Sequence, residues 1–247
     1  MDEFFFEIFE VLPRQGPGNR AVTKKAFEAI KGLPPKPKIL DIGCGTGTQT
    51  FDLAEMTDGD ITALDNHPPF IDMLNQKAER AGLAHRVHGV VGDMSAPDFM
   101  PESFDLIWAE GSIYNIGYEE ALRRWRPLLK PMGYMAVSDL VWLKADPPEK
   151  VKNFLRSESP GVKFAEDLLS DAERLRYRLI DHFFLPDEAW REDYYKPMAQ
   201  AIPGMRKKYP EDQNMQKFLD SLELEIEMFR DYSDYYGYVF IILQKHD

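Results

Sequence analysis

Three glycines at alternate positions, Gly43, Gly45 and Gly47, form the most informative feature of this 247-residue sequence. Glycine accepts a positive φ, and it lets another group approach the backbone where a Cβ would block the way. Asp41 stands two positions before the first glycine, where its carboxylate suits a cationic group better than a phosphate. A dinucleotide fold prefers G-x-G-x-x-G, with the pyrophosphate on a helix N-terminus. The run predicts a turn that holds a nucleotide-like ligand, the plainer alternative being a tight turn without one.

The segments around the glycines must hold this turn in place. Residues 39–42 are predicted to form a short buried strand, and residues 50–55 the start of a helix. Residues 60–65 are predicted to be a second strand that ends in Asp65, with Asn66 beside it. In nucleotide-binding βαβ units a carboxylate about 20 residues beyond the turn meets the ribose hydroxyls. Asp65 is therefore a candidate for that contact, or else a cap for the helix after Pro68 and Pro69.

The run "ILDIGCGTG" (39–47) resembles motif I of the class I S-adenosylmethionine-dependent methyltransferases. The resemblance implies that the loop, with Cys44 as a small filler, wraps the methionine part of the cofactor and that Asp41 serves its ammonium. Asp93 and Met94, after a predicted third strand (85–91), match the positions that read the adenine in that family. Residues 103–111 resemble the fourth strand. Residues 126–137 resemble the turn into the fifth, except that Met132 replaces a usual glycine.

The resemblance implies an α/β fold: a Rossmann-like sheet of seven mostly parallel strands, helices on both faces and an antiparallel last strand. We expect one domain over 1–247. It would comprise an N-terminal helical segment (1–35), a cofactor-binding core (36–145) and a helical insertion (186–235) between strands six (178–185) and seven (238–244). A helix is expected over 164–177. The late segments resemble a branch that is similar to the quinone-biosynthesis methyltransferases.

Candidate site residues follow from these positions. The predicted cofactor-binding residues are Asp41, Gly43, Cys44, Gly45, Gly47, Asp65, Asn66, Asp93, Met94 and Glu110. Glu110 is a candidate base or a contact for a cationic acceptor, and a carboxylate that only makes hydrogen bonds to loop amides or touches the cofactor fits the pattern at least as well. His182 is the other candidate base, although a histidine within a strand more often packs or bonds locally. Tyr114 and Asn115 are expected to face the methyl acceptor. His67 is expected near the adenosine. Trp190 and the late tyrosines could line the acceptor pocket or a cation-binding cage, or simply pack.

Composition narrows the class of protein. A net charge of −12 argues against nucleic acid as a partner, because phosphates require a basic surface. The single cysteine excludes an internal disulfide and suits a reducing cytoplasm. The apolar start (Phe4, Phe5, Ile8, Phe9) is too short and too acidic for a signal peptide, and no stretch approaches the roughly 20 apolar residues of a membrane span. No His/Cys spacing indicates a metal.

The expected function is methyl transfer to a small molecule. The alternatives are a binding protein without turnover, a protein methyltransferase, and a nicotinamide-dependent oxidoreductase, against which the glycine spacing argues. A stripe of apolar residues in the insertion must be buried, against the sheet or against a second copy in a homodimer: Met215, Phe218, Leu219, Leu222, Ile226 and Phe229.

Overall fold

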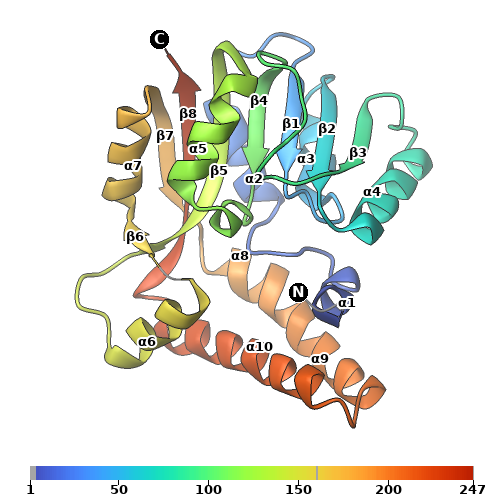
Figure 1. Ribbon diagram of the computed structural model, residues 1–247, viewed down its shortest axis with the longest axis vertical. Coiled ribbons are helices and arrows are strands. Elements are labelled where there is room, and N and C mark those ends of the chain that lie inside the picture. The colour runs from blue at the N-terminus through green and yellow to red at the C-terminus, as the bar shows by residue number, and fades with distance from the viewer. Residues whose placement is uncertain (1–3, 160, 247) are drawn as a thin grey trace.

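The sheet at the centre of the computed structural model has the strand order β3-β2-β1-β4-β5-β8-β7 (Figure 1). The structure describes residues 4–159 and 161–246. The strands are β1 (Lys38–Ile42), β2 (Asp60–Asp65), β3 (Val87–Val91), β4 (Phe104–Ala109), β5 (Leu129–Trp142), β7 (Tyr177–Phe184) and β8 (Tyr236–Lys245). The chain runs outward from β1 to β3 and then returns to place β4 on the other side of β1. The predicted α/β class and seven main strands are confirmed.

The strand β8 is antiparallel to both of its neighbours, β5 and β7, as the sequence predicted for the last strand. One short strand was not predicted. β6 (Lys163–Phe164) pairs with the end of β5, beyond the last residue of β4 that pairs there. The helix expected over 164–177 is therefore shorter, and α7 spans Ala165–Arg174. Two residues of strand are too few for a period-2 pattern, so the pairing depends on the partner that β5 offers.

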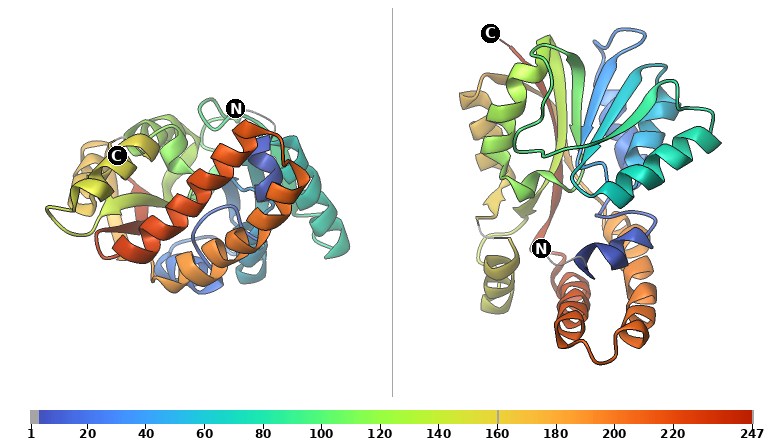
Figure 2. Two further views of the ribbon diagram at one scale, coloured as in Figure 1. Left: turned by 90° about the horizontal axis from the view of Figure 1, so that it is seen from below. Right: turned by 45° about the vertical axis from the view of Figure 1, so that its right-hand side comes forward.

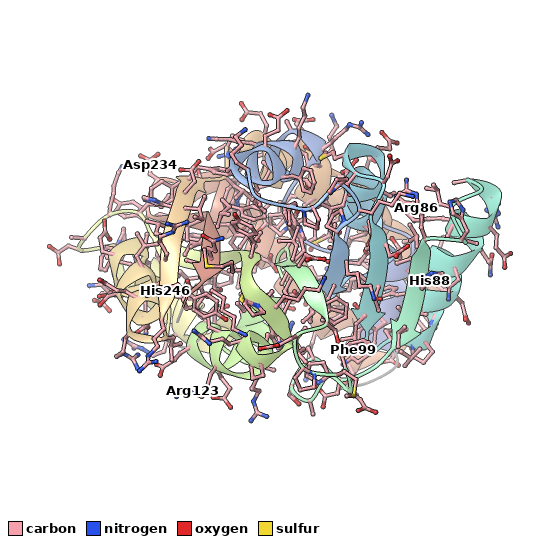
Figure 3. All side chains as sticks on the ribbon, turned by 90° about the horizontal axis from the view of Figure 1, so that it is seen from above. Arg86, His88, Phe99, Arg123, Asp234 and His246 are labelled. Atoms are coloured by element: carbon pink, nitrogen blue, oxygen red, sulfur yellow. The ribbon has the colours of Figure 1, made fainter. Side chains whose placement is uncertain are left out.

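Helices cover both faces of the sheet. α2 (Arg20–Ala29), α3 (Thr48–Met56) and α4 (Pro68–Arg80) pack on one face, and α5 (Tyr118–Trp125) and α7 pack on the other. The strands alternate between the two cores: Ile39, Leu106 and Trp108 face the first, whereas Leu40 and Ile107 face the second. Seen along the strands, Arg86 and His88 mark the β3 side of the sheet, and Arg123 and His246 mark the opposite side (Figure 3).

The insertion lies beyond the carboxyl ends of the parallel strands (Figures 1 and 2). It consists of α8 (Glu188–Trp190), a π-helical turn (Arg191–Tyr195), α9 (Lys196–Lys208) and α10 (Gln213–Tyr232). The apolar stripe of α10 is mostly buried within the chain, with Met215, Leu219 and Phe229 at 1% exposure or less. Because the chain itself covers much of this stripe, the stripe no longer requires a second copy, and the homodimer stays a prediction.

The N-terminal segment connects the insertion with the glycine loop. α1 (Phe4–Glu10) buries Ile8 and Phe9, and Glu7 accepts hydrogen bonds from Lys208 and Tyr209 at the end of α9. The expectations for residues 1–3 and for the side chains of Phe4 and Phe5 lie outside what the structure describes. Asn19 caps α2 as predicted, because its side chain accepts a hydrogen bond from the Val22 N–H at 3.0 Å. None of the described helices is both long enough and apolar enough to cross a bilayer.

Candidate ligand-binding site

The glycine loop lies at the point where the sheet reverses its strand order. β1 pairs with β2 on one side and with β4 on the other, and all three strands are parallel. Ligands of open α/β sheets bind outside the carboxyl ends of the strands at such a switch point. Gly43, Gly45 and Gly47 connect β1 with α3, and their φ angles are 71°, 55° and 89°. The loop therefore uses the left-handed region at all three positions, which only glycine adopts readily.

A Cβ at each of these glycines would also require a neighbouring side chain to shift. A Cβ on Gly43 would lie 2.4 Å from the Cβ of Ser112, and one on Gly45 would lie 2.4 Å from Oε1 of Gln15. A Cβ on Gly47 would approach Leu74 at 2.7 Å. The loop is thus in close contact with the segment after β4, with the N-terminal segment and with α4.

Asp41 lies under this loop and is fully buried. Its carboxyl group accepts hydrogen bonds from Thr50 Oγ1 at 2.6 Å and from Gln49 Nε2 at 3.4 Å. Burial raises the pKa of Asp41 to about 7. A carboxyl group that is costly to ionise would gain from a nearby cation. Its role toward an ammonium stays a prediction.

Asp65 ends β2 and is tied to the glycine loop. Its Oδ2 accepts a hydrogen bond from the Gly45 N–H at 2.9 Å, and its Oδ1 accepts one from the His67 N–H at 3.0 Å. Burial raises the pKa of this carboxyl group. Asn66 is exposed beside it. The ring of His67 stacks on Phe6 and makes a 2.7 Å hydrogen bond with Glu10, so the predicted loop histidine contacts α1.

The segment after β3 lies next to Asp65. The Gly92 N–H donates to the Asp65 carbonyl at 2.9 Å. The carboxylate of Asp93 accepts two hydrogen bonds from Ser95, and these bonds lower its pKa. The Met94 carbonyl accepts a hydrogen bond from Trp125 Nε1 at 2.9 Å, and the methyl carbon of the Met94 side chain lies near Gly43. The predicted adenine-reading pair and the predicted ribose contact thus both lie at the carboxyl ends of the parallel strands.

Glu110 directly follows β4 and is held by three donors. Arg14 forms an ion pair with its Oε2, while Thr23 Oγ1 and Trp108 Nε1 donate to its Oε1 at 2.7 and 2.9 Å. The carboxylate side chain is 2% exposed. Both carboxylate oxygens are thus occupied by donors from three separate segments, so this geometry favours anchoring over general-base chemistry.

His182 lies elsewhere. It is exposed on the edge strand β7, where it pairs with Ile241 of β8. β5 and β8 separate β7 from β4, which at about 4.8 Å for each strand spacing puts His182 roughly 14 Å from β4. The structure does not bring this candidate base to the glycine loop. Tyr114 and Asn115 are in a 3₁₀ turn (Ile113–Asn115) that follows β4, and their contact with an acceptor stays a prediction.

The aromatic residues of the insertion are mainly buried. Trp190 stacks on Phe229 with 4.5 Å between ring centroids and meets Tyr238 edge-on at 4.6 Å. Tyr195 donates a hydrogen bond to Glu225 at 2.9 Å. Burial raises the pKa of Tyr194, Tyr195 and Tyr238 well above the usual value, so these phenols stay neutral.

Three polar residues of the site were missed by the sequence reasoning. Gln15 accepts a hydrogen bond from the Thr46 N–H at 3.0 Å, and Arg14 pairs with Glu110. Asp139 lies in β5, just beyond the last residue of that strand that pairs with β4, and it is 9% exposed. Burial raises its pKa to about 7. The signal for Asp139 was an acidic residue inside the apolar run Met135–Val141, whereas the pairing of Arg14 has no local signal.

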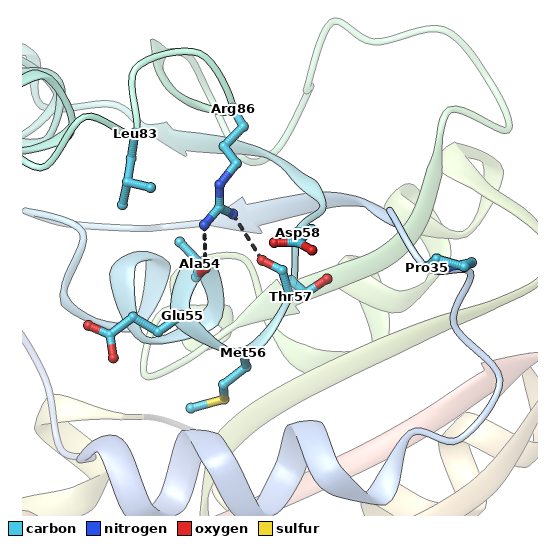
Figure 4. Close-up of a pocket in the computed structure, with 8 residues that line it drawn as sticks. All are labelled: Pro35, Ala54, Glu55, Met56, Thr57, Asp58, Leu83 and Arg86. Atoms are coloured by element: carbon cyan, nitrogen blue, oxygen red, sulfur yellow. Dashed lines mark hydrogen bonds between the residues drawn. The ribbon is translucent and has the colours of Figure 1, made fainter.

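A hollow at the other end of the sheet has an ordinary structural explanation (Figure 4). Arg86 reaches across it and donates hydrogen bonds to the carbonyls of Ala54 at 2.5 Å and Thr57 at 3.0 Å, where α3 ends. A cation in this position caps the last carbonyls of a helix. Among residues 4–159 and 161–246, no three His, Cys, Asp or Glu side chains gather as a metal site.

The chain is similar to known proteins in sequence and in fold. Residues 39–133 match the family model described as a methyltransferase domain. The chain is 32% identical to the sterol 24-C-methyltransferase of Aspergillus fumigatus over 185 residues, which are 70% of this chain and 48% of that protein. It is 34% identical to phosphoethanolamine N-methyltransferase 3 of Arabidopsis thaliana over 119 residues, 47% of this chain and 24% of that one. The chain thus spans at most about half the length of these curated relatives.

Among solved structures, the fold is similar to that of a Geobacter sulfurreducens methyltransferase crystallised with S-adenosyl-L-homocysteine. The TM-score is 0.85, the identity is 19%, and the match covers 100% of this chain and 99% of that one.

Proposed function

Because residues 39–133 match a methyltransferase domain, we propose that the chain is an enzyme that transfers a methyl group from S-adenosylmethionine to a small molecule. The observation that carries the proposal is the glycine loop at the strand-order switch, with Asp65 at the end of the neighbouring strand. A loop whose three glycines have positive φ angles suits a ligand that contacts bare backbone. The same curated relatives are sterol and phosphoethanolamine methyltransferases, so a small-molecule acceptor is favoured.

In this proposal each side chain has a separate task. Asp65 and Asn66 bind the ribose, Asp93 and Met94 read the adenine, and Asp41 compensates the ammonium. The sulfonium of the bound cofactor is already a strong methyl donor, so the protein has to align an acceptor and exclude water. Tyr114 and Asn115, which follow β4, are the residues that we propose meet the acceptor. Gln15 and its neighbours, which cover the loop, would keep water out.

The acceptor itself is proposed only as a class. The quinone-related branch suggested by the sequence stays a prediction, since the relatives described above methylate other molecules. A base is required only if the acceptor must lose a proton during attack. Glu110 and His182 are not assigned this role, the first because Arg14 holds it and the second because it lies at the edge strand.

The experiment is a calorimetric titration of the purified protein with S-adenosylmethionine, S-adenosylhomocysteine and NAD in parallel. Micromolar binding of the first two, without binding of NAD, would support the proposal. Binding of NAD alone would overturn it in favour of a nicotinamide-dependent oxidoreductase. Formation of S-adenosylhomocysteine with a panel of sterols, amines and phenols then separates an enzyme from a protein that only binds the cofactor.

A further inference from the structure

Arg14 has a guanidinium nitrogen, Nη1, that is buried and has no hydrogen-bond partner among the residues that the structure describes. Its other terminal nitrogen, Nη2, pairs with Glu110, and the arginine side chain is only 6% exposed. A buried charged donor without an acceptor is costly, and native proteins rarely leave one unmet. This nitrogen therefore indicates an acceptor that the chain itself does not supply.

The neighbours of Arg14 fix its position over the glycine loop. The Pro13 carbonyl accepts a hydrogen bond from Thr48 Oγ1 at 2.5 Å, and Gln15 Oε1 accepts one from the Thr46 N–H at 3.0 Å. Between these two contacts, Arg14 reaches Glu110, the first residue after β4. Residues 13–15 thus connect the loop after β1 with the end of β4, which are the two sides of the switch point where a ligand is expected.

The charges around Arg14 have both signs. The pKa of Asp41 responds to Arg14, which lowers it, and to Glu110, which raises it, so the three groups act on one another. Gly18 accommodates the arginine, since a Cβ there would come within 2.5 Å of Nη2. A guanidinium with a free donor beside a buried carboxyl group matches a zwitterion: the guanidinium fits a carboxylate, and the carboxyl group fits an ammonium.

The direction of a bound ligand follows from the strand order. Asp65 ends β2, on one side of β1, whereas Glu110 and Arg14 are at the end of β4, on the other side. A ligand whose ribose meets Asp65 and that extends across β1 brings its far end to Arg14. In S-adenosylmethionine that far end is an α-amino acid, which is a zwitterion.

We propose that Arg14 binds the α-carboxylate of the methionine part of S-adenosylmethionine through its free Nη1. The inference rests on the function proposed above and assigns the cofactor contact that the sequence pattern missed. It also explains why the segment that carries Arg14 is tied to the loop on both sides: the guanidinium must be held in place to meet one carboxylate.

Decarboxylated S-adenosylmethionine provides the test, because it keeps the adenosine, the sulfonium and the ammonium and lacks only the carboxylate. We expect the unmodified protein to bind S-adenosylmethionine roughly 10- to 100-fold more tightly than this analogue, as for a charge-assisted hydrogen bond. Arg14→Met should bring the two affinities to within about threefold of each other, by weakening only the carboxylate-bearing ligand. Arg14→Lys should retain part of the preference. Arg20→Ala, which removes an exposed arginine of α2, is the matched control and should leave the preference unchanged.

The substitution also leaves Glu110 without its ion-pair partner, so Arg14→Met/Glu110→Gln is the second variant; it removes both charges and keeps a similar shape. Circular dichroism and the melting temperature establish that each variant is folded. The inference is overturned if a folded variant loses affinity for both ligands equally, since Arg14 would then be only a positioning residue. Equal affinity of the unmodified protein for the two ligands overturns it without any variant, and leaves the proposed function intact. Binding of neither ligand overturns the proposed function and this inference together.

Discussion

Asp139 should make the stability of this protein fall as the pH rises from 5 to 8. The carboxyl group is buried in β5 and accepts a hydrogen bond from the N–H of Leu140 at 2.8 Å. Burial raises its pKa from 3.8 to about 7. Between these two values the folded protein keeps the proton while the unfolded chain has lost it. With respect to this group, the free energy of unfolding is therefore highest at low pH. It declines as the pH rises, until Asp139 ionises in the folded protein.

The size of the effect follows from the same two values. At 1.36 kcal/mol for each pH unit, the interval from 3.8 to about 7 corresponds to about 4 kcal/mol. About 3 kcal/mol of this should be lost between pH 5 and pH 8. Asp139→Asn removes the titrating group and keeps the shape of the side chain. The free energy of unfolding of the variant, relative to that of the unmodified protein, should therefore rise by this amount between pH 5 and pH 8.

Urea unfolding followed by circular dichroism at pH 5, 6, 7 and 8 measures the difference in the free energy of unfolding between each variant and the unmodified protein. Asp41 titrates in both proteins, and its contribution cancels. Asp234→Asn is the control. A hydrogen bond from Lys144 lowers the pKa of Asp234, so the contribution of this group to stability is lost only in acid. The difference in the free energy of unfolding between this variant and the unmodified protein should therefore stay constant from pH 5 to pH 8. Parallel pH profiles for Asp139→Asn and the unmodified protein would refute a buried, protonated Asp139.

Three further changes test the site. Asp65→Ala should weaken S-adenosylmethionine binding by roughly 1–3 kcal/mol through lost charge-assisted hydrogen bonds, whereas Asp60→Ala at the exposed start of β2 should not; unchanged affinity in calorimetry would remove Asp65 from the site. Gly45→Ala should cost clearly more stability than Gly82→Ala in urea unfolding. Both have a positive φ, worth about 1–2 kcal/mol, but only Gly45 faces an atom 2.4 Å from the new Cβ. His182→Ala should leave cofactor affinity and turnover within about twofold, and a larger loss would contradict its position at the edge strand.

The order of the elements could be predicted because each carries a local pattern. The second strand was predicted over 60–65, which are its bounds in the structure, since an apolar strand there lies between polar turns. The glycine loop was identified from three residues whose conformation almost excludes other side chains. Such features depend on neighbours in the sequence and need no knowledge of distant partners.

The site was harder to predict because its polar contacts join distant segments. Arg14 and Glu110 are 96 residues apart, and neither the arginine in the stretch "LPRQGPG" nor the glutamate shows which residue it pairs with. Glu110 was therefore considered as a base, although three donors surround it. His182 was a candidate only by residue type, since the strand order that places β7 at the edge cannot be read from the strand itself.

The distribution of buried polar groups connects the fold with its proposed function. Asp41, Glu110 and Asp139 are buried carboxyl groups, and each lies near the carboxyl end of a parallel strand. At the opposite end, Asp105 instead pairs with Lys130 and accepts from the Lys38 N–H. Burying carboxyl groups at one end opposes folding unless something compensates them. Arg14 compensates one of them, and a ligand that carries an ammonium, a sulfonium and a carboxylate would complement Asp41 and Arg14 together. The unfavourable free energy of burying these carboxyl groups therefore arises at the end of the sheet where binding of such a ligand can offset it.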